Sequence, residues 1–226
     1  MLLVVVGNTS RGEIEQMVAD TFGSMPMGNF EKQMPPSTSF SEPSIKIVHR
    51  DLPTNYIQGS FSAPVRTTDE GYTMNITRSI LRDRVWEEVR TKRSLSYAPT
   101  SRYGNLLSNY AAIYVTAVDA DSTIKVMIAE LQRLKDEPIP KRELENKKRQ
   151  FITFYYLGNE TNQNQAGVLT RFELSGAGYE EMDRFIDKLM KVTPEDIQAV
   201  ANKYMNNLQF VLIGNPESLE VKNFMY

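Results

Sequence analysis

The most informative segment of the sequence is WEEVRTKRSLSY, which spans residues 86–97. It has the pattern of a helix that ends in basic residues and runs directly into a strand opened by a tyrosine. Arg90 on the last helical turn and Tyr97 at the start of the strand can face the same cleft. There they would offer a charged fork and a phenolic donor to peptide carbonyls or to a developing oxyanion. Cations at a helix C-terminus also suit the helix dipole, so a purely structural role is the alternative.

The elements on either side of this segment alternate between strand and helix periodicity. Residues 45–48 and 56–62 alternate as strands, and residues 67–70, TTDE, have capping-box spacing ahead of a long helix that reaches Arg90. Residues 97–103 and 109–118 then predict a strand pair. Two strands therefore precede the long helix and two follow it.

The rest of the chain is mainly helical. A helix introduced by Asp119 or Asp121 covers residues 124–134, a second helical region starts at residue 143, and Thr193 opens a further helix by N-cap chemistry. The final strand is residues 209–213. The order β-β-α-β-β-α-α-α-α-β predicts an α+β fold, with a mostly antiparallel sheet and helices packed on one face.

The two ends of the chain resemble each other. Residues 3–8, LVVVGN, are echoed by residues 210–215, FVLIGN, and a short Glu-containing segment with helical spacing follows each copy. If this unit closes a structural repeat, the chain opens with the tail of one repeat and contains the whole of the next. We then expect a buried strand near residues 2–6; the alternative is a chance match of two ordinary strand-turn-helix units.

Composition places bounds on function. The chain has 226 residues, 41% of them apolar, which is enough to bury a sizeable core. Its 26 Lys and Arg against 28 Asp and Glu leave no broad basic field, so we expect no nucleic-acid partner. The apolar run of residues 2–6 is far too short to span a bilayer, and we expect no membrane segment in this sequence.

Several kinds of catalytic site are excluded by residue content. His49 is the single histidine and there is no cysteine, so neither a His-rich zinc site nor a Ser-His-Asp triad can be built within the chain. Residues 7–12, GNTSRG, lack the lysine and spacing of a phosphate-binding loop. We therefore expect no catalytic residue, no metal ligand and no cofactor in this chain. The absence of cysteine also leaves the cellular compartment open.

Several stretches of the chain are similar to those of a known family. Residues 89–97, VRTKRSLSY, resemble the stretch Leu-Arg-Glu-Lys-Arg-Gly-Leu-Ala-Tyr of the insulinase/pitrilysin family of inverted-motif zinc metallopeptidases. The opening strand of residues 3–7 resembles the closing strand of a family repeat, and residues 192–204 resemble the penultimate helix of a repeat. The likeness covers nearly the whole chain.

In that family two αβ repeats enclose a chamber. The first holds an inverted zinc motif, His-x-x-Glu-His, and the second supplies an arginine and a tyrosine that bind substrate. The resemblance therefore implies that Arg90 and Tyr97 are substrate-binding residues. It also implies that zinc belongs to a catalytic repeat, either in the same full-length protein or in a partner subunit.

The resemblance further implies a division of the chain and a function. Residues 1–25 would be the tail, strand plus helix, of a preceding repeat, residues 26–44 a linker, and residues 45–226 a non-catalytic metallohydrolase-like domain. The function implied is the substrate-binding half of a zinc-dependent metalloendopeptidase acting on peptides, with no activity for this chain alone. The alternative is a structural or scaffold member of the same fold without peptidase activity.

Overall fold

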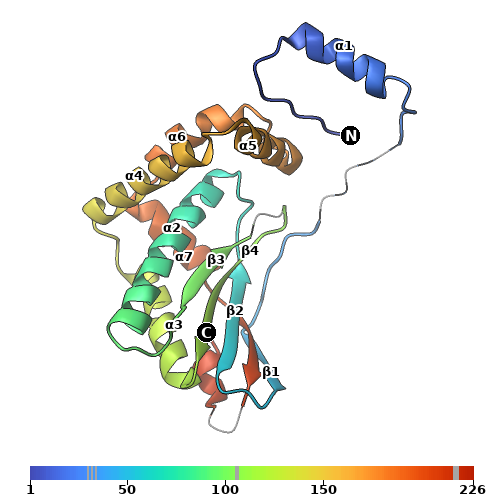
Figure 1. The fold of residues 1–226 in the computed structure, drawn as a ribbon. Coiled ribbons are helices and arrows are strands. Elements are labelled where there is room, and N and C mark those ends of the chain that lie inside the picture. Colours follow the sequence, from blue (N-terminus) through green and yellow to red (C-terminus); the bar gives the residue numbers. More distant parts are fainter. Residues whose placement is uncertain (30, 32, 34, 105–106, 216–218) are drawn as a thin grey trace.

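The computed structural model describes residues 1–29, 31, 33, 35–104, 107–215 and 219–226. In these residues, five strands form one sheet at the centre of the molecule (Figure 1). They are β1 (Ser44–His49), β2 (Asn55–Ser62), β3 (Thr100–Tyr103), β4 (Tyr110–Ala117) and β5 (Gln209–Gly214). Their spatial order is β1-β5-β2-β4-β3. Only the β1–β5 pair is parallel, so the sheet is mixed and mostly antiparallel, as expected.

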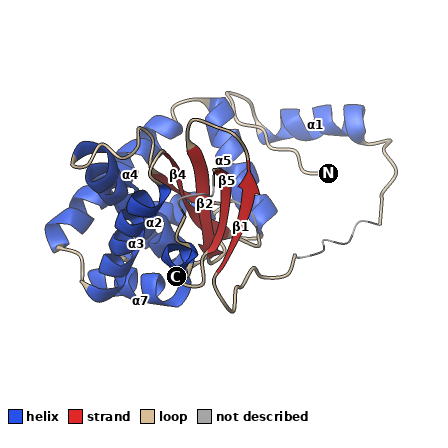
Figure 2. Cartoon of the chain, turned by 90° about the horizontal axis from the view of Figure 1, so that it is seen from below, coloured by secondary structure: helices blue, strands red, loops and turns tan. Residues whose placement is uncertain are grey.

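Helices cover one face of this sheet, with α2, α3 and α7 on the same side of the strands in Figure 2. The helices of the main body are α2 (Asp69–Val85), α3 (Ala120–Asp136), α4 (Lys141–Gly158), α5 (Asn162–Ser175), α6 (Glu181–Lys191) and α7 (Pro194–Tyr204). Two short helices of other types are the π-helix η1 (Trp86–Thr91) and the 3₁₀-helix η2 (Val221–Phe224). The described residues thus place five α-helices between β4 and β5, one more than the sequence pattern predicted.

The core lies between the sheet and these helices. Alternate residues of β2 and β5, such as Ile57, Phe61 and Phe210, are buried against the helical layer. Gly59 lies beneath the Phe210 ring, where an added Cβ would come within 2.4 Å of a ring carbon. Because a strand shows one face to each side, the residues between these buried ones lie on the helix-free face, where Tyr56 is partly exposed.

Side-chain caps set the starts of several helices, with one correction to the prediction. Thr193 and Asp196 form the capping box of α7, and Asp119 caps α3. The predicted capping box over residues 67–70 is wrong: Thr68 is the N-cap of α2 and accepts a hydrogen bond from the amide of Gly71. Since the third helical residue is a glycine, it has no side chain to return the bond.

The N-terminal segment differs from expectation. The buried strand expected near residues 2–6 does not form, and Leu2, Leu3 and Val5 are exposed. A strand needs a neighbour to satisfy its amides, and none of the five described strands pairs with this segment. The helix that follows is present as α1 (Arg11–Phe22), which has a capping box but no buried residue. Figure 1 shows it away from the sheet.

The segment after β5 lies partly outside the described residues. The helix expected around residues 217–221 includes residues that the structure does not describe, and the visible part is η2. Phe224 of η2 packs edge-on against Phe210, with 5.2 Å between the ring centroids. Within the described ranges, no helix is long and apolar enough to cross a membrane.

Candidate functional site

The helix that carries Arg90 changes its winding just before that residue. Helix α2 passes without a break into η1, where hydrogen bonds such as Lys92 N–H to the Glu87 carbonyl (2.9 Å) span five residues instead of four. Single π-turns of this kind are frequent at functional sites. The chain leaves η1 through Ser94, whose φ of 52° lies in the left-handed region. This sharp exit brings Tyr97 back beside the helix.

Arg90 lies between two aromatic rings. Its Cζ is 4.2 Å from the centroid of Trp86 and 4.1 Å from that of Tyr97. One guanidinium nitrogen, Nη1, also donates a hydrogen bond to the Tyr97 carbonyl at 3.0 Å. Both rings lie within the usual range for cation–π attraction, so the guanidinium is held in place while Tyr97 stays 77% exposed.

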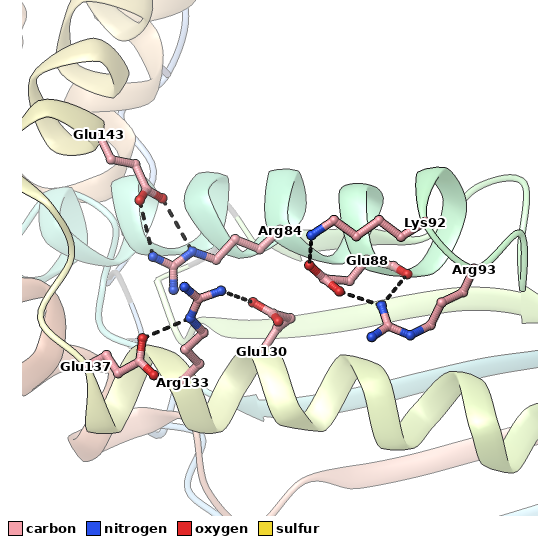
Figure 3. Close-up of polar contacts among 8 residues, drawn as sticks. All are labelled: Arg84, Glu88, Lys92, Arg93, Glu130, Arg133, Glu137 and Glu143. Carbon is pink, nitrogen blue, oxygen red and sulfur yellow. Dashed lines mark hydrogen bonds and ion pairs between the residues drawn. The ribbon is translucent and has the colours of Figure 1, made fainter.

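The neighbouring cations are occupied elsewhere. Lys92 Nζ donates to the Glu88 carboxylate at 2.6 Å, and Arg93 binds the same carboxylate and, at 2.9 Å, the Glu88 carbonyl (Figure 3). The side-chain hydrogen bond from Lys92, followed by the one from Arg93, lowers the pKa of Glu88 below its usual value. Arg90 has no ion pair with any carboxylate in the described part of the chain. Of the three cations in residues 90–93, only Arg90 keeps its charge uncompensated.

A charged cluster lies where α2 and η1 face α3. Its members are Arg84, Glu88, Lys92, Arg93, Glu130, Arg133, Glu137 and Glu143. Arg84 binds Glu143 through two bonds of 3.3 Å, and Arg133 binds Glu137 at 2.9 Å, with Figure 3 showing the side chains between the two helices. Glu130 is buried, and its Oε2 has no hydrogen-bond partner. Burial is the main cause that raises the pKa of Glu130 above its usual value.

A hollow of about 580 Å³ lies next to the Arg90–Tyr97 pair. It is lined by Trp86, which stacks on Arg90, and by residues 98–100, which follow Tyr97. Arg90 and Tyr97 do not themselves line it. The segment between them is anchored to the sheet because Ser96 Oγ donates to the Thr116 carbonyl at 2.5 Å.

No group of three or more His, Cys, Asp or Glu side chains among the described residues is placed to hold a metal ion. His49, the single histidine, is the last residue of β1 and is exposed. A zinc ion therefore does not fit the residues of this chain that the structure places.

The structure brings together the two residues predicted from sequence and adds a third. No role is predicted for Trp86 from the sequence, but its ring lies against Arg90, as does the ring of Tyr97. The signal was available: residues 86 and 90 are four apart, and side chains at that spacing meet on a helix surface. The π-turn itself left no recognisable mark in the sequence.

Comparison with known proteins gives one family and a consistent fold. A family model described as the peptidase M16 inactive domain matches residues 1–151. An uncharacterized zinc protease of Mycobacterium leprae is 23% identical over 219 residues, which is 91% of this chain and 48% of that protein. The chain thus spans about half the length of the curated relative that it matches.

Solved structures share the fold at low sequence identity. The peptidase M16 inactive domain structure from Pseudomonas fluorescens superposes with a TM-score of 0.84 at 18% identity, over 95% of this chain and 54% of that one. A chain of Complex III2 from Candida albicans superposes with a TM-score of 0.80 at 13% identity, over 96% of this chain and 56% of that one.

Proposed function

Because this chain belongs to the family of peptidase M16 inactive domains, we propose that it is the substrate-binding half of a zinc-dependent metalloendopeptidase. The active site would be completed by a zinc-bearing domain, in the same full-length protein or in a partner subunit. The observation that carries the proposal is the Arg90 guanidinium, held between two rings with no carboxylate partner among the described residues. A charge that is positioned but not neutralised is available to an external group.

The geometry gives each residue a distinct task. A guanidinium has five N–H donors, and Arg90 directs one of them to the Tyr97 carbonyl, so the others can bind carbonyl oxygens of a peptide. The exposed Tyr97 adds a phenolic donor beside it. Zinc, held by the other domain, would supply Lewis-acid chemistry at the scissile carbonyl. Trp86 acts as a positioning residue, because its ring restricts where the guanidinium can lie.

Kinetics of the enzyme reconstituted with its zinc-bearing half test this proposal. Arg90→Ala or Tyr97→Phe should lower kcat/KM by roughly 10²–10³-fold, the usual scale for the loss of one transition-state donor. Zinc content and the free energy of unfolding should stay unchanged. Lys92→Ala is the matched control, because that neighbouring cation is bound to Glu88, and it should leave kcat/KM within about twofold of the wild type.

Two results would refute the assignment of the pair. One is wild-type turnover in both variants, and the other is a loss that unfolding explains in full. A family protein without peptidase activity would show a third pattern, in which the complete assembly cleaves no peptide at all.

That third pattern corresponds to a structural or scaffold role, which we keep as the second candidate. Its support is the similarity to a chain of Complex III2, which concerns the fold alone. A His-x-x-Glu-His motif in the adjoining domain or in a partner subunit would favour the peptidase. Its absence from both would favour the scaffold.

A further inference from the structure

A second hollow, of about 760 Å³, lies in a part of the molecule with no assigned role. It is enclosed by the start of α2 and by α4, α5 and α6. Its walls contain six aromatic residues, which are Tyr72, Phe151, Phe154, Tyr155, Phe172 and Phe185. The volume falls within the roughly 300–1,000 Å³ of small-molecule sites, which are typically apolar with a few polar groups.

The two charged residues in this wall are both cations, and the other polar residues are neutral. Arg66 and Arg171 both line the hollow. Behind Arg66, Arg78 donates to Asn75 Oδ1 at 3.0 Å, and Arg66 approaches the same oxygen at 3.5 Å, so two guanidinium groups converge on one amide. Burial lowers the pKa of Arg78 to about 10, and the charge of Arg66 contributes to this. The wall is therefore positively charged as well as apolar.

The lack of carboxylate partners sets Arg66, Arg78 and Arg171 apart from several other cations of the molecule. Lys147 pairs with Asp83, Lys148 with Glu145, and Arg84 with Glu143. In the described ranges, neither Arg66, Arg78 nor Arg171 has a carboxylate within ion-pair distance, and the Nε of Arg78 is buried without any partner. Arg66 and Arg78 are half-buried, and a cation partly removed from water without an anion is costly, so an external anion would stabilise this wall.

We propose that this hollow binds a small amphipathic carboxylate, with its head at Arg66 and Arg171 and its apolar chain against the aromatic wall. Arginine forks bind carboxylates through paired hydrogen bonds. The exposed N-terminal segment of this chain is not the occupant, since residues 1–5 line a separate hollow with Leu169 and Glu173 of α5. This site is independent of the proposed peptidase role.

Calorimetric titration of the 226-residue chain with decanoate tests the proposal, with decanol as the uncharged probe of equal chain length. Decanoate should bind one saturable site at least tenfold more tightly than decanol. Arg66→Gln should weaken decanoate binding at least tenfold and leave decanol binding unchanged, because a charge-assisted bond contributes only for the anion. Arg102→Gln is the matched control and should change neither, since Arg102 lies over the Tyr114 ring as Arg66 lies over the Tyr103 ring, but Arg102 is outside this hollow.

The opposite results are equally clear. Absence of saturable decanoate binding, or equal affinity for decanoate and decanol, overturns the proposal. If Arg66→Gln fails to fold, Arg171→Gln on the exposed side of the hollow takes its place, and unchanged decanoate affinity in that variant also overturns it.

Discussion

At the scale of single residues, the site depends on how one carboxylate is shared. Glu88 binds both Lys92 and Arg93, and this leaves Arg90 to the two rings. If Glu88 were bound to Arg90 instead, the guanidinium would be neutralised and turned towards the helix. The sharing of Glu88 by Lys92 and Arg93 thus accompanies an Arg90 that has no carboxylate partner among the described residues.

Ser94 gives a stability prediction, because its φ of 52° is unfavourable for a residue with a Cβ. Ser94→Gly should raise the free energy of unfolding by about 0.5–1 kcal/mol, the difference between relief of that strain and the entropy cost of glycine. Urea denaturation measures it. The similar family stretch has glycine at this position, and glycine adopts a left-handed backbone without strain.

Ser96→Gly is the control for Ser94→Gly, and it should have the opposite sign. Ser96 has no positive φ, and its hydroxyl bonds the Thr116 carbonyl. Its loss should cost about 1 kcal/mol. Destabilisation by Ser94→Gly would show that the strain at this exit from the helix is offset elsewhere.

Glu130 gives a prediction on pH dependence. Burial raises its pKa above the ordinary value of 4.5, so the folded state holds its proton longer than the unfolded state. Its contribution to stability is therefore present at low pH and is lost as pH rises through the window above 4.5. Glu130→Gln should match the wild type near pH 3 and exceed it at pH 7 by about 1 kcal/mol, the scale for an unpartnered buried polar atom.

Urea denaturation at both pH values provides the check for Glu130→Gln. A variant less stable than the wild type at pH 7 would mean that the charge of Glu130 towards Arg133 outweighs the cost of its burial.

At the scale of elements, the sequence predicted most helices and strands because their periodicity and caps are local. Thr193 with Asp196 illustrates this, since a capping box is written in four consecutive residues. The π-turn at Trp86–Thr91 was not predicted, because no sequence pattern marks it. The convergence of Arg90 and Tyr97 was expected from their positions at a helix end and a strand start, whereas the stacking of Trp86 on Arg90 was not.

The strand predicted for residues 2–6 failed for a different reason. Its apolar pattern is clear, yet a strand is completed by a partner, and the pattern does not say where that partner is. The same pattern at residues 209–213 did give a strand, because β1 and β2 lie on either side of it. Periodicity alone cannot distinguish these two cases.

Deletion of residues 1–25 should leave the main body intact, because α1 has no buried residue. We expect the free energy of unfolding to change by less than about 0.5 kcal/mol, as for changes away from the core. Urea denaturation of the full and shortened chains measures the difference. A loss above about 1 kcal/mol would show that this segment packs on the body more firmly than its exposure indicates.

At the scale of the whole molecule, the chain is one αβ unit that matches about half of its curated relative. Added zinc should not stabilise it: the melting temperature at one equivalent of zinc should equal that in the presence of a chelator. The reason is that a ligand stabilises a fold only if it binds the native state, and the described residues offer no metal site. A rise of several degrees would contradict this.

The position of β5 also bears on how the protein is made. A ribosome releases the chain from its N-terminus, so β1 and β2 emerge long before residues 209–214, which must be inserted between them. In the described sheet β1 has β5 as its single neighbour. Until residues 209–214 have emerged, β1 is therefore an unpaired strand, and β2 has one open edge. A nascent chain with such edges is prone to aggregation and is a natural client for chaperones.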